Sequence, residues 1–251
     1  MPEGLLKRPS GEALIFDPNP SEAAATVEVV RDVVMVICKE PLAGLVKTRM
    51  CPPFSPEQAA ELARAALADT FAACEAVGAD RLVAVIDGAA GGWISGNWEV
   101  VHQSVGGLDQ RLAAAFADVL QPTDRGVLLA MDTPQATAGQ IRGALQALRS
   151  HDAVIGMTED GGFWIIGLNA ARADAFVGVP MSTTETGLAQ RERLWTLGLS
   201  VATIDVLRDL DTADDVRVVC GDHPNLLSAQ WFNGLGPIAS LAGLSSEESP
   251  A

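Results

Sequence analysis

Short apolar runs alternate with helical patterns along most of this chain, and this alternation limits the possible folds more than any other feature. Residues Val33 to Cys38 form a continuous apolar run rich in β-branched residues, which is typical of a strand buried on both faces of a sheet. Strands that alternate with helices predict a three-layer α/β/α sandwich with a mainly parallel, mixed sheet. Further strands are expected at 82–86, 98–102, 127–131, 153–157, 163–168 and 201–205.

The helices are indicated by their capping residues and apolar spacing. Ser55, Pro56 and Gln58 combine an N-cap, a proline at the first helical position and a capping box, which predicts a helix that ends at Gly78. The segment 108–120 is predicted to be a helix because its apolar residues fall on one face. These residues are Leu108, Leu112, Ala115, Phe116 and Val119. Other helices are expected at 137–148, 187–197 and 212–219, the last of them being the final helix of the chain.

We divide the chain into one α/β domain at 31–220, an N-terminal extension at 1–30 and a C-terminal extension and tail at 221–251. The sequence contains no internal repeat, and no linker rich enough in proline, glycine or serine to suggest a further division. Residues 239–251 are typical of a frayed tail.

Charge and cysteine usage exclude several classes of partner. The chain has 32 acidic and 17 basic residues, for a net charge of −15, which argues against nucleic acid or an anionic membrane surface as partner. No apolar run approaches the roughly 20 residues that cross a bilayer, and no signal peptide is recognisable. Four scattered cysteines without a CxxC pair indicate free thiols, so we expect a cytoplasmic protein.

Ligands of such sheets bind beyond the carboxyl ends of the strands, so the loops there are the candidate sites. The loop from Lys39 to Arg49 holds three cations in an otherwise acidic chain, and Gly44 lets its backbone turn. In an extended segment Lys47 and Arg49 share a face and can clamp a polyphosphate, although it is not a Walker loop. A solvated basic loop explains the residues equally well.

Three aspartates are candidate ligands for a divalent cation. Asp132 directly follows a buried strand, and Asp209 and Asp211 alternate in a later loop, so their carboxylates can point to one side. Carboxylate oxygens are the ligands that Mg²⁺ prefers. The alternative for Asp132 is a cap of the next helix.

Three further loops carry polar groups with two possible roles each. The Glu159–Gly162 loop brings Asp160, Gly161 and Gly162 to a ligand or makes a tight hairpin turn. Gly106 and Gly107 precede a helix and offer backbone N–H groups to a base or phosphate. The 180–187 loop, with Ser182, Thr183 and Glu185, binds an acceptor or caps the next helix.

Taken together, these motifs resemble one family in the same order over about residues 33–218. They are CKEPLAGLVKTRM, PEQAAELARAALADTFAA, GGLDQRLAAAF, LAMDTPQ, EDGGFWIIGL, PMSTTETG and LRDLDTADD. The family is the uncharacterised glycosyltransferase-A-like family, usually described as glycosyltransferases or radical-enzyme-associated transferases. The segment KTRM…PEQAAELARAALADTF is also similar to the start of phospholactate and phosphoenolpyruvate guanylyltransferases.

The resemblance implies a nucleotide-diphospho-sugar transferase (GT-A) fold and a role for each matched residue. It implies catalytic roles for Lys47, Arg49, Asp132 and Asp160, and a Mg²⁺ site (or Mn²⁺) at Asp132, Asp209 and Asp211. The implied nucleotide-binding residues are Lys39, Pro41, Gly44, Lys47, Arg49, Gly106, Gly107, Leu108 and Arg111. The implied acceptor-binding residues are Asp160, Gly161, Gly162, Ser182, Thr183 and Glu185.

Three functions remain open at this point. The leading hypothesis is a Mg²⁺-dependent nucleotidyltransferase, which joins an NTP to a phosphorylated small acceptor, either a sugar phosphate or a small acid phosphate, and releases pyrophosphate. The alternative is a glycosyltransferase with an NDP-sugar donor, in which Asp160 is the general base. A non-catalytic nucleotide-binding protein is the third. The sequence leaves the oligomeric state open, with a homodimer as one option.

Overall fold

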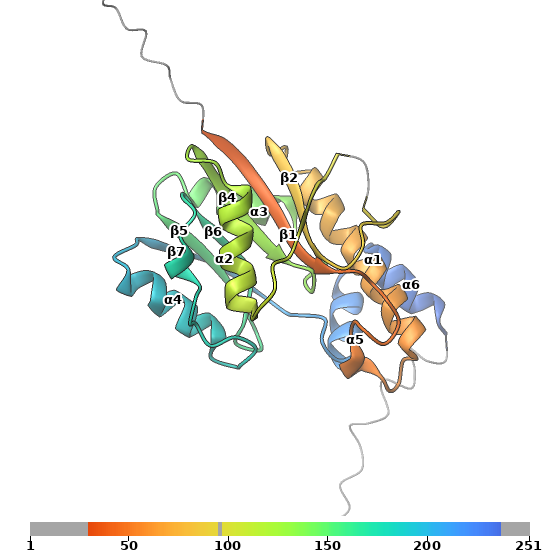
Figure 1. Cartoon of the computed structure of the whole chain (residues 1–251). Helices are drawn as coiled ribbons and strands as arrows, with labels where there is room; N and C mark the ends of the chain where they lie inside the picture. The colour runs from red at the N-terminus through yellow and green to blue at the C-terminus, as the bar shows by residue number, and fades with distance from the viewer. Residues whose placement is uncertain (1–29, 95–96, 237–251) are drawn as a thin grey trace, which may run out of the picture.

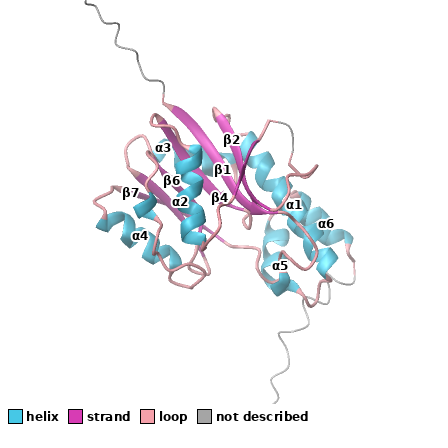
Figure 2. Ribbon diagram, in the orientation of Figure 1, coloured by secondary structure: helices cyan, strands magenta, loops and turns pink. Residues whose placement is uncertain are grey.

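The computed structural model describes residues 30–94 and 97–236. Its described residues form one seven-stranded sheet with helices on both faces (Figures 1 and 2). The strand order is β3-β2-β1-β4-β6-β5-β7. The strands are β1 Arg31–Lys39, β2 Arg81–Asp87, β3 Glu99–His102, β4 Asp124–Ala130, β5 Ala153–Thr158, β6 Phe163–Leu168 and β7 Val201–Leu207.

The sheet is mainly parallel, as predicted. Only β6 runs against its neighbours, and it pairs antiparallel with β4 and β5. The other pairs are all parallel. The carboxyl ends of six strands therefore meet at one edge of the sheet, and the β5–β6 turn lies at this same edge.

The sheet separates two hydrophobic cores. On one face α1 and α3 pack around Trp164, and on the other α2 and α4 pack around Phe116 and Phe176, whose ring centroids are 5.0 Å apart. The three-layer prediction is thus confirmed. The helices are α1 Pro56–Glu75, α2 Leu108–Val119, α3 Ala138–Ala147, α4 Thr186–Thr196, α5 Ala213–Asp222 and α6 Leu227–Gly234, with 3-10 turns η1 Thr48–Met50 and η2 Ala173–Ala175.

Local capping chemistry determines where the main helices begin. The Ser55 side chain accepts from the backbone N–H of Gln58, whose side chain accepts from Ser55 in return, so the predicted capping box is confirmed. Thr212 and Asp215 form the same box at the start of α5. Thr137 begins α3, also as expected.

Two helix predictions were wrong. Leu108 is 41% exposed rather than buried, because it is the first residue of α2 and lies where that helix opens toward solvent. The chain also continues beyond α5 into α6, which packs on α1 (Figure 1). The side chain of Asp69 on α1 caps α6 by accepting from the backbone N–H groups of Leu227 and Ser228 at 2.8 and 2.9 Å. A cap that comes from a distant helix leaves no mark in the local sequence.

The remaining expectations concern the thiols, the ends of the chain and the membrane. All four cysteines are free, as predicted, and three of them are buried. All but the last residue of the extension predicted at 1–30, and the tail expected at 239–251, lie outside the described residues. Among the helices of the described residues, none combines the length and apolar character needed to span a bilayer.

Candidate active site

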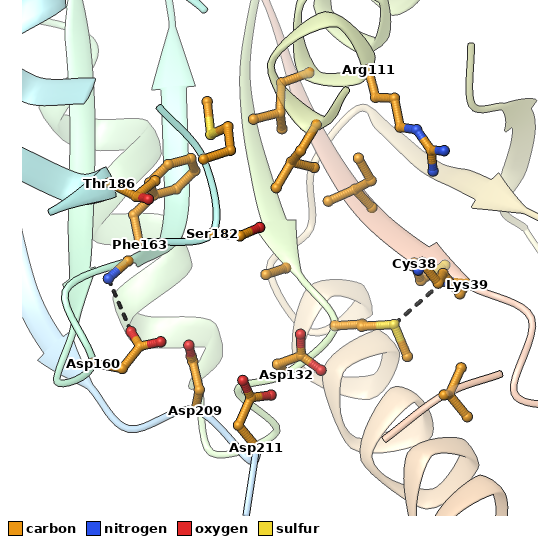
Figure 3. A pocket seen from close by; sticks show the side chains of 18 of the residues that line it. Cys38, Lys39, Arg111, Asp132, Asp160, Phe163, Ser182, Thr186, Asp209 and Asp211 are labelled. Carbon is orange, nitrogen blue, oxygen red and sulfur yellow. Dashed lines mark hydrogen bonds between the residues drawn. The ribbon is translucent and has the colours of Figure 1, made fainter. Parts of the chain in front are cut away.

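A cavity of about 850 Å³ lies at the edge of the sheet where the parallel strands end. Its walls come from the loop after β1, the start of α2, the end of β4, the β5–β6 turn, the loop before α4 and residues 209–211 (Figure 3). Segments far apart in the sequence thus meet around one space, as the topology requires of strand-end loops.

Lys47 is held at the centre of the acidic side of this cavity. Its side chain is only 6% exposed and contacts the carboxylates of Asp132 and Asp211, the latter at 3.4 Å, as well as the carbonyl oxygen of Leu210. Burial by itself lowers the pKa of Lys47, but Asp132 and Asp211 outweigh it and the net pKa is raised. The ammonium group therefore stays charged.

The backbone at Lys47 is strained. Its φ of 51° lies in the left-handed region, which non-glycine residues adopt mostly where the surrounding structure enforces it. The expectation of an extended segment from Lys47 to Arg49 was wrong, because Thr48–Met50 is a 3-10 turn. The two cations are brought together instead by Asp211, which accepts from Arg49 at 3.0 Å.

The acidic side also contains Asp209, which lies between Asp160 and Asp211 in Figure 3. Burial, together with the negative charges of Asp132, Asp160 and Asp211, raises the pKa of Asp209 to about 8, although Lys47 opposes the shift. Its Oδ1 atom is buried without a hydrogen-bond partner among the described residues. The cluster thus holds more negative charge than Lys47 alone neutralises.

These carboxylates fit a hard divalent cation in their chemistry. The unpartnered Oδ1 of Asp209 is an oxygen ligand without another role, and Asp132 and Asp211 both contact a single ammonium group, so one cation reaches both. However, no three carboxylates, imidazoles or thiols of the described residues form a ready-made metal site. Lys47 takes the position between Asp132 and Asp211.

The opposite side of the cavity is basic and carries an ordered guanidinium group. Arg111 donates to the carbonyl of Gly106 at 3.0 Å and to the carboxylate of Asp87 at 3.0 Å. It also donates to Oε1 of Gln103 at 3.2 Å. Gln103 lines the cavity too, and the sequence analysis missed it, because a glutamine after a short strand carries no motif. Lys39 lies on this same side (Figure 3).

The residues expected to bind the nucleotide divide into two groups. Lys39, Lys47, Arg49, Gly106, Leu108 and Arg111 line the cavity. Pro41, Gly44 and Gly107 do not: Pro41 is buried, Gly44 turns the loop with a φ of 76°, and Gly107 is the N-cap of α2. These three shape the loops around the cavity.

The third wall is formed by the β5–β6 turn and the loop before α4. The Asp160 carboxylate accepts from the Thr158 hydroxyl at 2.6 Å and from the backbone N–H of Gly162 at 2.9 Å. Asp160, Gly162, Ser182 and Thr183 line the cavity, whereas Gly161 and the exposed Glu185 do not. The sequence analysis missed Phe163 as a lining residue, and it did not single out Met181, Thr184 and Thr186 within the 180–187 loop that it named.

Gly161 and Gly187 let the two segments of this wall pack closely against each other. Gly161 has a φ of 92°, and a Cβ atom at this position would overlap the carbonyl oxygen of Thr184. The backbone N–H of Gly187 donates to the Gly161 carbonyl at 2.8 Å. The β5–β6 turn and the loop before α4 are therefore packed backbone to backbone, and Gly161 has a packing role.

The architecture is that of the nucleotide-diphospho-sugar transferases. A Desulfovibrio desulfuricans G20 protein with the provisional name nucleotide-diphospho-sugar transferase superposes with a TM-score of 0.76 and 22% sequence identity, covering 85% of this chain and 99% of that one. A nucleotidyl transferase from Methanothermobacter thermautotrophicus gives a TM-score of 0.51 at 15% identity, covering 75% and 95%. Rv0371c from Mycobacterium tuberculosis, crystallised with manganese, gives 0.45 at 19% identity, covering 76% and 98%, which is too weak a similarity to support an inference.

The chain belongs to the family DUF2064, described as uncharacterized proteins conserved in bacteria, whose model matches residues 58–183. The family and the fold together confirm the resemblance drawn from the motifs. No curated protein matches this chain.

Proposed function

We propose that this protein is a transferase that acts on a nucleotide, and specifically a divalent-metal-dependent nucleotidyltransferase that joins an NTP to a phosphorylated small acceptor. The observation that carries the proposal is the distribution of charge in the cavity. Lys39, Lys47, Arg49 and Arg111 all line it, in a chain with a net charge of −15, and two of them, Lys47 and Arg49, contact carboxylates there. Cations beside carboxylates suit a polyphosphate bound with a metal ion.

In the proposed reaction a phosphate oxygen of the acceptor attacks the α-phosphorus of the NTP. The bond from this phosphorus to the oxygen of the β-phosphate breaks, and pyrophosphate leaves with the electron pair. The attacking phosphate is already anionic, so no general base is required. Lys47 and Arg49 hold and neutralise the phosphates, while Arg111 and Lys39 bind the opposite end of the nucleotide.

Asp132, Asp209 and Asp211 are the residues that would hold Mg²⁺ or Mn²⁺. A bound divalent ion supplies further neutralisation of phosphate charge. For the protein itself, Lys47 has to exchange part of its contact with Asp132 and Asp211 for contact with the nucleotide. Lys47 lines the cavity while it contacts both carboxylates, and this position suits it to both partners.

The test is pyrophosphate release from each NTP with a panel of phosphorylated acceptors, with and without Mg²⁺. Lys47→Ala is expected to lower kcat/KM about 10²- to 10³-fold, because the positive charge closest to the carboxylates and phosphates is lost. Arg217→Ala is the matched control, since Arg217 pairs with Asp214 on the exposed surface of α5. Full activity of the Lys47 variant would contradict the role given to this residue.

Glycosyl transfer from an NDP-sugar is the second candidate, and the position of Asp160 favours it. This carboxylate lines the cavity on a wall without lysine or arginine, where it can take a proton from an acceptor hydroxyl. Thermal shift separates the two candidates. Stabilisation by NTP with Mg²⁺ supports nucleotidyl transfer, whereas stabilisation by an NDP-sugar with Mn²⁺ supports glycosyl transfer.

The free thiols of all four cysteines support the prediction of a reducing, cytoplasmic location.

A further inference from the structure

The cations are distributed unevenly around the cavity. Its basic side chains, Lys39, Lys47, Arg49 and Arg111, come from the loop after β1 and from α2. The cavity-lining residues of the segments 160–163 and 181–186, here called the acceptor wall, include no lysine, arginine or histidine. The wall does carry one formal charge, the negative charge of Asp160. Figure 3 shows Arg111 and Lys39 on one side of the cavity and Asp160, Phe163 and Ser182 on the other.

The acceptor wall instead combines hydroxyl groups with apolar surface. Ser182, Thr183 and Thr184 are exposed residues that line the cavity and bring three hydroxyl groups to it. The Thr183 hydroxyl also lies 3.3 Å from the Thr186 hydroxyl and accepts from the backbone N–H of Glu185. Phe163 and Met181 lie beside them and are half-buried. This surface suits a ligand that has hydroxyl groups on one face and carbon atoms on another.

Arginines that follow the wall in the described chain are engaged elsewhere, and the nearest of them, Arg191, lies over the ring of Trp195 at 4.9 Å from its centroid. Arg208 pairs with Glu159 and with Asp215, the latter at 3.1 Å, and it does not line the cavity. Arg193 donates to the backbone carbonyls of Asp174 and Val177. The close packing of Gly161 against Thr184 also makes the wall rigid. A cation is therefore not supplied by a small movement of the wall.

From this arrangement we infer that the acceptor, apart from its reacting phosphate, is uncharged and hydroxyl-bearing, and that acceptors with a carboxylate are rejected. A carboxylate placed on this wall loses water, meets no cation and lies near Asp160, so its binding is costly. The inference rests on the proposed function and selects among its acceptors: it favours sugar or polyol phosphates over the small acid phosphates that the sequence left open.

Matched acceptor pairs test this inference. Glucose 1-phosphate and glucuronic acid 1-phosphate differ only in a hydroxymethyl group that is replaced by a carboxylate, and glycerol 3-phosphate and 3-phosphoglycerate differ in the same way. Pyrophosphate release gives kcat/KM for each, and ligand-detected NMR in the presence of NTP and Mg²⁺ gives relative binding. We expect the hydroxymethyl member of a pair to be favoured about tenfold or more in both measurements.

A variant adds the missing charge. Thr184→Lys places a cation on the wall, and Thr184→Gln is the control of similar length without charge. The quantity compared is the ratio of kcat/KM for the hydroxymethyl member to kcat/KM for the carboxylate member. We expect Thr184→Lys to lower this ratio several-fold, and Thr184→Gln to leave it within about twofold of the parent value. Thermal unfolding shows whether each variant is folded, and reading the ratio within one variant removes effects common to both ligands.

The outcomes separate this inference from the proposed function. If pyrophosphate is never released but the hydroxymethyl members still bind better, nucleotidyl transfer fails and the inference on the wall is supported. Equal or better use or binding of the carboxylate members overturns the inference, as does a ratio that Thr184→Lys leaves unchanged. Failure of both members of both pairs to bind overturns it as well.

Discussion

At the scale of single residues, Gln103 connects the sheet to the basic side of the cavity. Its side-chain amide nitrogen donates to the carbonyl oxygens of Cys38 and Val85, at 2.9 and 3.1 Å, while its Oε1 atom accepts from Arg111. The ends of β1 and β2 are thereby tied to each other and to the guanidinium group. Gln103 is a positioning residue for Arg111.

Replacing Gln103 with alanine tests this role. We expect the KM for the nucleotide to rise about tenfold with a smaller change in kcat, because Arg111 loses one of the acceptors that orient it, a contact worth about 1–2 kcal/mol. Steady-state kinetics with varied NTP gives the two parameters. Gln146→Ala, on the exposed surface of α3, is the control. A variant with unchanged KM would show that Arg111 is oriented without Gln103.

At the scale of elements, α6 supports the loops that carry the candidate catalytic residues. Phe232 of α6 belongs to the same buried cluster as Met50 and Phe54, which follow Lys47, and as Leu210, which lies between Asp209 and Asp211. The ring centroids of Phe54 and Phe232 are 6.2 Å apart. Packing of α6 therefore helps to hold the basic loop against the late aspartates, although α6 itself contributes no residue to the lining of the cavity.

The capping of α6 by Asp69 gives the prediction at this scale. Asp69→Ala leaves the N–H groups of Leu227 and Ser228 without their partner, so we expect the free energy of unfolding to fall by about 2–3 kcal/mol. Urea denaturation measures the loss, and hydrogen exchange is expected to become faster at 227–234. Asp69→Asn keeps one acceptor oxygen and serves as the milder comparison. Unchanged exchange in α6 would contradict the capping role.

At the scale of the whole molecule, stability depends on pH through several carboxylates with lowered pKa values. The Ser200 hydroxyl and backbone lower the pKa of Asp152, and the Arg81 guanidinium lowers the pKa of Glu99. A carboxyl group with a lower pKa in the folded state stabilises that state above its unfolded pKa. This contribution is lost as the pH falls through the folded pKa. Acidification below about pH 4 is therefore expected to destabilise the protein.

Asp152→Asn separates this effect from the general charge of the chain. At pH 7 we expect the variant to unfold at a slightly lower urea concentration than the parent, because the charged hydrogen bonds to Ser200 are weakened. At pH 3 the difference is expected to be smaller, because this pH lies below the ordinary pKa of an aspartate, where the stability that comes from the lowered pKa of Asp152 begins to be lost. Equal differences at both values would mean that packing, and not the charge of Asp152, explains the loss.

Much of the molecule was predictable because its signals are local. The apolar run at 33–38, the capping box of Ser55 and Gln58, and that of Thr212 and Asp215 each act within a few residues, so they specify strands and helix starts wherever the chain goes. The loops that carry the charged residues were also predictable, because they follow predicted strands and parallel strands bring their carboxyl ends to one edge of the sheet.

The contacts between distant segments were decided only by the tertiary structure. The sequence by itself determined the layered α/β fold and the loops in which Lys47, Asp132 and Asp211 lie. It did not determine that Lys47 would be buried between those two carboxylates, that Asp69 would cap α6, or that Leu108 would be exposed at the cavity instead of packed in the core. These outcomes depend on packing and on charges summed over the whole fold, and no window of the sequence contains both partners.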